Sequence, residues 1–130
     1  MKKGLGKLRN HFPLATINSV DIFSALYPLY ANPAKYGKPK LRFEQPLVTC
    51  CGYGGKYNYN AAAGCGQTVN VNGTNIVVGS CKDPSVRVDW DGSHFTEVAN
   101  KFVFDQISNG TFSDPPIPLK MACHPTQLHS

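Results

Sequence analysis

Apolar residues recur at helical spacing in one segment towards the C-terminal end of the chain. They form a single face made of Phe95, Val98, Ala99, Phe102, Val103 and Ile107. Thr96 is a suitable N-cap, Glu97 places an acidic group in the first turn, and Asn109–Gly110 follows the last apolar position. The pattern therefore predicts a helix that begins after Thr96 and ends before Asn109.

Three segments nearer the N-terminus also have a distribution of apolar and polar residues that predicts secondary structure. Residues 2–11 are basic and predict a short helix, and residues 14–23 are rich in Leu, Ile, Val and Thr and predict a mostly buried strand. Residues 24–36 have near-helical apolar spacing, but Pro28 and Pro33 should restrict them to short or irregular turns.

The middle of the chain is less regular. Residues 37–45 predict a polar loop, and residues 46–51 a short extended piece. Residues 56–75 contain many Asn, Gly, Tyr and Ala residues without a period and predict a long irregular loop, whereas residues 74–80 predict a short strand. Pro115, Pro116 and Pro118 should keep the tail extended.

Size and charge narrow the class of protein. The chain has 130 residues, of which 42% are hydrophobic and 16% charged, which favours one domain and excludes a disordered chain. No run approaches 18 apolar residues, so we expect no membrane span. Residues 1–42 have a net charge of +7 and residues 43–130 of −2. Without aromatic interleaving or a nucleic-acid motif, we interpret the basic part as solvated surface rather than an anion-binding arm.

The cysteines and two sequons indicate an oxidising compartment. The five cysteines lack the close C-x(2–4)-C pairs of a zinc site, and their odd number leaves at least one unpaired in a monomer: Cys50, Cys51, Cys65, Cys81 and Cys123. Asn72 and Asn109 begin N-x-T sequons. The N-terminal segment has no uninterrupted apolar stretch, so a signal peptide is not predicted.

Candidate chemistry is concentrated in residues 90–94, Trp-Asp-Gly-Ser-His. Asp91 and His94 are three positions apart across an Asp-Gly turn. This spacing allows the carboxylate to accept a hydrogen bond from Nδ1–H of the imidazole and leaves Nε2 available as a base. The alternative is an ordinary turn followed by an exposed histidine.

Four stretches carry a resemblance to a known family: residues 32–37, residues 46–58 with the double cysteine, residues 83–97, and residues 112–116. Together they resemble the C-terminal part of plant GDSL-type esterase/lipases of the SGNH hydrolase superfamily. The subgroup with early-nodulin-like esterases and proteins labelled α-L-fucosidases is the most similar. The resemblance implies an α/β fold class, namely one partial domain over residues 1–130 from a three-layer α/β/α, flavodoxin-like sandwich with a parallel sheet.

The resemblance also implies roles for individual residues. Asp91 would orient the imidazole and His94 would be the general base, with Asp89 at a position where relatives usually have Asn. Residues 38–42 look like an insertion. The family's Gly-Asp-Ser nucleophile block and its oxyanion-hole blocks are not in this sequence, and Ser93, like Ser80 and Ser85, lacks the context of a nucleophile.

We therefore expect that the chain belongs to a family of ester hydrolases and is inactive by itself. It resembles the C-terminal third of a secreted enzyme whose export signal and nucleophilic serine lie upstream. The expected partners are an acyl or acetyl ester and the missing N-terminal portion of the fold; no cofactor, metal or nucleic acid is expected. The alternatives are a non-catalytic binding or regulatory fragment, a fragment with no independent role, or a glycoside hydrolase like the relatives labelled fucosidases. A glycoside hydrolase needs two carboxylates at a defined separation, and Asp89 and Asp91 are too close in sequence to provide it.

A secreted parent favours two disulfides among Cys50, Cys51, Cys65 and Cys81, which would leave Cys123 free. The alternative is a reactive thiol at Cys50 or Cys51. A fragment of such a sandwich should also expose an apolar patch and be poorly soluble or loosely packed. The residues expected in this patch are Phe102, Val103, Phe104 and Ile107.

Overall fold

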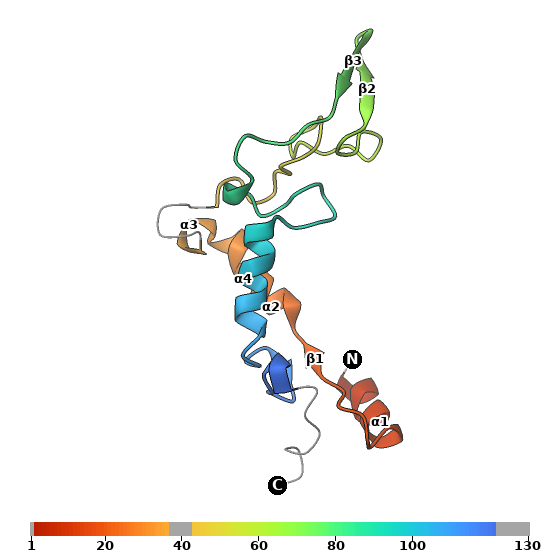
Figure 1. Ribbon diagram of the computed structural model, residues 1–130, viewed down its shortest axis with the longest axis vertical. Coiled ribbons are helices and arrows are strands. Elements are labelled where there is room, and N and C mark those ends of the chain that lie inside the picture. Colours follow the sequence, from red (N-terminus) through yellow and green to blue (C-terminus); the bar gives the residue numbers. More distant parts are fainter. Residues whose placement is uncertain (1, 37–42, 122–130) are drawn as a thin grey trace. The chain divides into compact units, whose positions relative to one another are not determined.

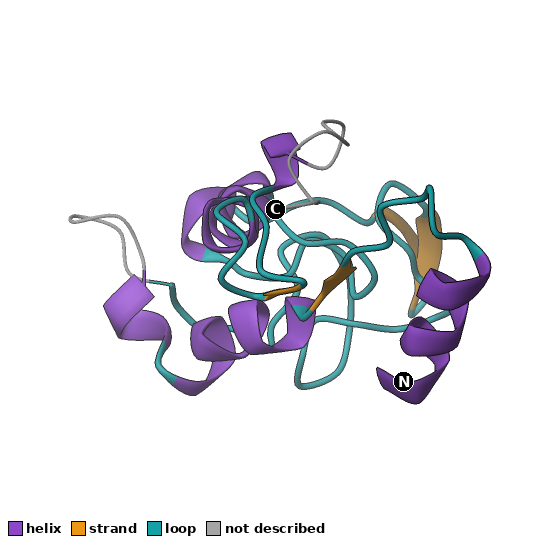
Figure 2. Cartoon of the chain, turned by 90° about the horizontal axis from the view of Figure 1, so that it is seen from below, coloured by secondary structure: helices purple, strands orange, loops and turns teal. Residues whose placement is uncertain are grey.

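The computed structural model describes residues 2–36 and 43–121, so the proposed insertion at 38–42 and Cys123 lie outside the described residues. Helices and short strands follow one another along the chain (Figures 1 and 2). Contacts divide the chain into two units, one made of residues 1–25 and 103–130 and the other of residues 26–102. No helix among the described residues is long and apolar enough to cross a membrane.

The first unit is held together by a two-stranded pair and one arginine. Strand β1 (Ser19–Val20) pairs antiparallel with β4 (Ser113–Asp114), and helix α1 (Lys2–His11) precedes them. Arg9 donates a hydrogen bond from Nε to the Ile17 carbonyl at 3.1 Å, another to the Asp114 carbonyl, and forms an ion pair with the Asp114 carboxylate. The predicted basic helix is confirmed, and Arg9 fixes it to the strand pair.

The buried strand predicted over residues 14–23 is wrong. Leu14 is 97% exposed, only Ser19–Val20 forms a strand, and helix α2 begins at Ile22. Asp21 explains the early start of the helix: its carboxylate accepts hydrogen bonds from the Ser24 backbone N–H at 3.0 Å and the Ser24 hydroxyl at 2.6 Å. An N-cap of this kind favours a helix over continued strand.

The second unit is built around a small helical core. Helix α2 (Ile22–Ala31) and helix α4 (Glu97–Ile107) contribute Leu29 and Ala99, which pack with Phe43 and Val88. Tyr36, at the end of helix α3 (Pro33–Tyr36), meets Phe102 edge to face at 5.5 Å between ring centroids. Half-buried side chains surround this centre: Leu26, Tyr30, Tyr36, Phe95, Val98 and Phe102.

The helix predicted after Thr96 is confirmed, whereas residues 24–36 are more regular than predicted. α4 has the predicted bounds within a residue, and Gly110, with φ of +87°, follows it. The expected restriction to short or irregular turns is wrong for α2, which has ten residues with Pro28 inside it, whereas Pro33 begins the short helix α3. Proline in a helix removes one N–H donor and crowds the preceding turn, and burial of the neighbouring Leu29 in the core favours the helix in spite of this.

A β-hairpin replaces part of the predicted long loop. Strand β2 (Thr68–Val71) pairs antiparallel with β3 (Thr74–Val77), in the register Val71 opposite Thr74. Asn72 and Gly73 form the turn with φ of +50° and +86°. The strand predicted at 74–80 is confirmed for its first four residues, but β2 was missed although Asn-Gly between two strands is a strong hairpin signal.

The segment 46–51, predicted as extended, begins instead with a turn in which Val48 N–H donates to the Gln45 carbonyl, and only Cys51 forms a bridge, with Ser80. The described strands all pair antiparallel. Short 3-10 helices occur at Pro84–Val86 and Leu119–Met121. The described part of the chain thus combines helices with small strand pairs.

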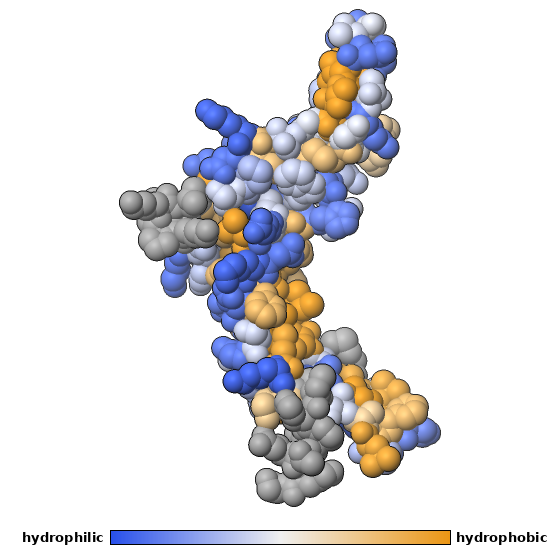
Figure 3. Space-filling model, viewed as in Figure 1, coloured by the Kyte–Doolittle hydropathy of each residue, from blue (hydrophilic) through white to orange (hydrophobic). Residues whose placement is uncertain are grey.

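Large apolar side chains remain exposed on both units, and Figure 3 shows them as orange areas on the face in view. The expected patch at 102–107 is present only in part, because Phe104 is exposed while Val103 is buried. Other large apolar residues that are exposed, outside residues 102–107, include Leu14, Phe23 and Val77.

Candidate active site

Residues 88–96 form a closed loop that carries the candidate residues. Thr96 N–H donates to the Val88 carbonyl at 3.0 Å, Asp89 and Phe95 form a β-bridge, and Trp90 N–H donates to the His94 carbonyl at 2.7 Å. Residues 91–93 are therefore confined to the tip of a narrow hairpin-like turn.

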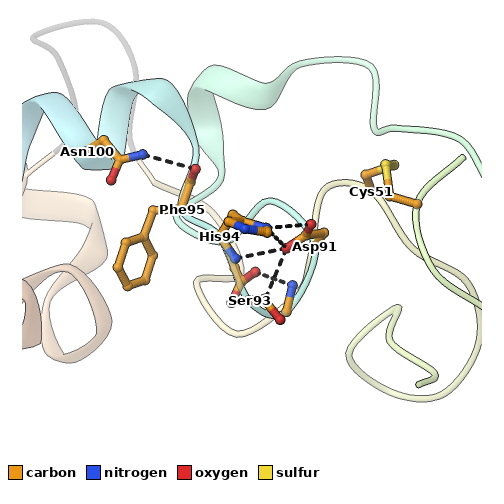
Figure 4. A network of polar contacts seen from close by, with 9 residues as sticks. Cys51, Asp91, Ser93, His94, Phe95 and Asn100 are labelled. Atoms are coloured by element: carbon orange, nitrogen blue, oxygen red, sulfur yellow. Dashed lines mark hydrogen bonds and ion pairs between the residues drawn. A yellow bond between two sulfur atoms is a disulfide. The ribbon is translucent and has the colours of Figure 1, made fainter.

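Asp91 and His94 face each other across this tip (Figure 4). Nδ1 of His94 lies 2.8 Å from Oδ2 and 3.0 Å from Oδ1 of Asp91. Oδ1 also accepts the backbone N–H groups of His94 and Ser93, at 2.8 and 3.0 Å. Because a carboxylate only accepts, this contact requires the proton on Nδ1. Among the described residues no group is hydrogen-bonded to Nε2.

The side chains of His94 and Asp91 differ in exposure. The His94 side chain is 75% exposed and that of Asp91 is 22% exposed. The hydrogen bond from His94, with smaller contributions from the backbone N–H groups of Ser93 and His94, lowers the pKa of Asp91 below its ordinary value. The carboxylate therefore stays ionised at neutral pH and is hydrogen-bonded to Nδ1 of the imidazole, most of which is exposed to solvent.

Two disulfides hold the segment beneath this loop. Cys50 and Cys51 donate backbone hydrogen bonds to the carbonyls of Asp89 at 3.0 Å and Trp90 at 2.6 Å. Both cysteines are buried, and Cys50 is bonded to Cys81 and Cys51 to Cys65. The prediction of two disulfides among these four residues is confirmed, and the alternative of a reactive thiol at residue 50 or 51 is wrong.

Thr96 fixes the other side of the loop. Its Oγ1 donates to the Arg87 carbonyl at 2.6 Å and accepts from Ala99 N–H at 3.3 Å, and the residue is buried. The predicted N-cap role is therefore confirmed. The bond to Arg87, which sequence reasoning missed, joins the start of α4 to the strand-like segment that enters the loop.

A pocket of about 420 Å³ borders the loop on the side of Gly92. Gly92 has a φ of +90°, and its N–H donates to Oδ1 of Asp89 at 2.7 Å. The ring of Tyr59 packs directly on Gly92. The other lining residues are Leu47, Thr49 and Tyr57. Sequence reasoning missed this pocket, although Asp89 and Gly92 have the spacing of a side-chain-capped turn.

Comparison with known proteins assigns the chain to a family. The model of the GDSL-like lipase/acylhydrolase family matches residues 1–107. This chain belongs to that family. No solved structure matches it.

The related GDSL proteins are from plants. The chain is 58% identical over 128 residues to an esterase of Hevea brasiliensis, covering 98% of this chain and 32% of that protein. It is 52% identical over 124 residues to the GDSL esterase/lipase ENOD8 of Medicago truncatula (95% and 30%), and 41% identical over 111 residues to alpha-L-fucosidase 3 of Arabidopsis thaliana (85% and 28%). The chain thus spans about a third of the length of these relatives.

Serine hydroxyls lie elsewhere in this GDSL-family chain. Ser85 donates to Asp83, Ser80 lies opposite Cys51, and Ser93 contributes only its backbone N–H to Asp91. Within residues 2–36 and 43–121 no serine hydroxyl is hydrogen-bonded to the His94 imidazole. The same residues contain no cluster of three or more His, Cys, Asp or Glu side chains that could hold a metal ion.

Proposed function

We propose that this chain carries the general base and the orienting carboxylate of a GDSL-type ester hydrolase. The contact between His94 Nδ1 and the Asp91 carboxylate, together with the solvent-facing Nε2, supports this proposal. Asp91 selects the tautomer in which Nε2 carries a lone pair, which is the state that a general base needs.

In the proposed reaction, His94 Nε2 removes the proton from a serine hydroxyl as the hydroxyl oxygen attacks the ester carbonyl. The imidazolium, stabilised by Asp91, then gives the proton to the departing alcohol. A water molecule repeats the sequence on the acyl-enzyme and releases the acid. The substrates are acyl or acetyl esters.

The serine and the oxyanion donors are proposed to come from the part of the family fold that this chain does not cover. No Gly-Asp-Ser occurs in its 130 residues. In the complete fold, these residues would belong to a three-layer α/β/α sandwich with a parallel sheet. The two disulfides support assembly in an oxidising, secretory compartment. The chain by itself is proposed to be inactive, since base and orienter without a nucleophile provide no acyl transfer.

The experiment joins this chain to the part of the Hevea esterase that it does not cover and measures kcat/KM on p-nitrophenyl butyrate. His94→Ala and Asp91→Asn in this chimera should each lower kcat/KM by about four orders of magnitude. His11→Ala is the matched control, because His11 is an exposed histidine on α1. The unfused 130-residue chain should show no hydrolysis above its own His94→Ala variant.

Two results would contradict the proposal. An active chimera that keeps its kcat/KM after His94→Ala would show that His94 is not the base. Hydrolysis by the unfused chain that disappears in His94→Ala would show that it already contains a nucleophile.

A further inference from the structure

The pocket beside Gly92 combines aromatic surface with a carboxylate. Tyr57 and Tyr59 are each about half exposed, at 44% and 49%, although both line the pocket. Asp89 is the charged residue in its wall. An aliphatic chain would gain from the rings but would have to cover the carboxylate, which is unfavourable for a charged group.

Asp89 has capacity for a ligand. Oδ1 accepts the Gly92 N–H at 2.7 Å, and no described side chain donates to Oδ2. An ionised carboxylate accepts through both oxygens, so Oδ2 can receive hydroxyl donors. Charge-assisted hydrogen bonds of this kind are about twice as strong as neutral ones.

The remaining wall is held rigidly in place. Thr49 Oγ1 donates to the Asn58 carbonyl at 2.6 Å, and the Asn58 side chain returns a hydrogen bond to the Thr49 carbonyl at 3.1 Å. Asn58 lies between the two tyrosines, so this exchange fixes the segment that carries both rings. Lys56 Nζ lies 5.4 Å from the Tyr57 ring centroid, which leaves Tyr59 as the main stacking surface.

We propose that this pocket binds a pyranose ring, with the C–H face of the sugar against Tyr59 and a hydroxyl group donating to Asp89. A flat ring with apolar faces and a rim of hydroxyl groups matches an aromatic surface beside an acceptor. Because Gly92 lines the pocket and lies between Asp91 and His94 in the sequence, the bound ring would contact the loop that carries the proposed base. That the ring is the sugar part of the ester substrate rests on the proposed function; the binding itself does not.

The test measures binding to the 130-residue chain by saturation-transfer NMR, with methyl glucopyranoside as the probe. Methyl butyrate and methyl hydroxycinnamate are the comparison arms for an aliphatic and a phenolic occupant. Tyr59→Ala should weaken pyranoside binding about tenfold, the equivalent of a lost aromatic contact. Tyr59→Phe should bind within about twofold of the parent, and Tyr27→Ala, an exposed tyrosine outside the pocket, should bind as the parent does.

Asp89→Asn tests the charge without removing the acceptor for Gly92 N–H, and should weaken pyranoside binding several-fold. The proposal is overturned if the pyranoside does not bind, if Tyr59→Ala binds it as tightly as the parent, or if butyrate or hydroxycinnamate binds more tightly. In the chimera, Asp89→Asn should also lower the ratio of kcat/KM for an acetylated pyranoside to that for butyl acetate. Because binding is measured on the 130-residue chain, a chimera without activity leaves the binding result standing.

Discussion

Tyr59 packs on Gly92 so closely that a Cβ atom at residue 92 would lie 2.5 Å from Cδ2 and Cε2 of the ring. The contact joins the segment that follows the double cysteine to the loop that carries Asp91 and His94. Glycine is needed at residue 92 for two separate reasons, the positive φ and the absence of room for a side chain.

Gly92→Ala should therefore destabilise the chain more than a positive φ alone explains. Gly73 is the matched control, because it has a φ of +86° and a methyl group added there would have nothing within 4 Å. We expect Gly73→Ala to lower the free energy of unfolding by roughly 1 kcal/mol and Gly92→Ala by about 2–3 kcal/mol, measured by chemical denaturation. In a Tyr59→Ala background the extra cost of Gly92→Ala should disappear; equal costs for both glycines would show that the ring moves away freely.

The ionisation of Asp91 should depend on His94. The hydrogen bond from His94 is the main cause of the lowered pKa of Asp91, so His94→Ala should raise that pKa towards the ordinary value of about 3.9. A lowered folded-state pKa stabilises the fold above the unfolded-state pKa, and this contribution is lost as the pH falls through the folded-state pKa. NMR titration of the side-chain carboxyl carbons measures the pKa of Asp91 in the parent and in His94→Ala.

Asp21 provides the control for that titration. Its pKa is also lowered, mainly by the hydroxyl of Ser24, so Ser24→Ala should raise it and His94→Ala should leave it unchanged. An Asp91 pKa that does not move in His94→Ala would mean that the imidazole contact is absent in solution.

Each disulfide should contribute separately to stability. The Cys50–Cys81 bond joins residues 31 positions apart and the Cys51–Cys65 bond residues 14 apart. Because each variant keeps the other bond, which lies in the same loop, loop-closure entropy predicts losses of about 3 and about 2.5 kcal/mol when each pair is replaced by alanines. Denaturation of the two double variants under non-reducing conditions checks the order. A larger loss for Cys51→Ala/Cys65→Ala would show that native contacts outweigh chain entropy here.

The two sequons should differ in glycosylation. Both asparagines are exposed, but Asn72 lies in the hairpin turn, whereas Asn109 Oδ1 accepts the Thr111 N–H at 2.9 Å and the adjoining Gly110 is buried against the backbone of Ile117 and Pro118. In a secretory host, with a leader added, we expect a glycan on Asn72 and little on Asn109. Thr74→Ala, which removes the first sequon but keeps Asn72, should abolish the mass shift. A shift that instead persists in Thr74→Ala and disappears in Asn109→Gln would reverse the assignment.

Local signals were sufficient for some elements. Helix α4 has a regular apolar period, an N-cap and a glycine after its end, so nothing outside the segment was needed to predict it. The facing of Asp91 and His94 also follows from a short loop. Helix α2 was placed late because Asp21 was interpreted as the end of a strand, when its carboxylate caps Ser24.

Long-range contacts account for what the sequence did not predict. The pocket depends on Tyr59 meeting Gly92, residues separated by 33 positions and brought together through Cys50, Cys51 and their partners. Which cysteine bonds to which likewise depends on how the double-cysteine segment docks on Asp89 and Trp90. Neither relation has a local pattern that could reveal it.

The Cys51–Cys65 bond is nested inside the Cys50–Cys81 bond, and two neighbouring residues decide which partner each takes. Because Cys50 and Cys51 are consecutive, a shift of this segment by one residue would place each cysteine where the other one bonds. The backbone bonds to Asp89 and Trp90 distinguish the two cysteines, so native pairing is favoured once residues 89–90 have docked. Oxidation before docking would proceed without this distinction between the two cysteines. The disulfide pairing found in a purified sample thus indicates whether the Asp91–His94 loop had docked on residues 50 and 51 before the thiols were oxidised.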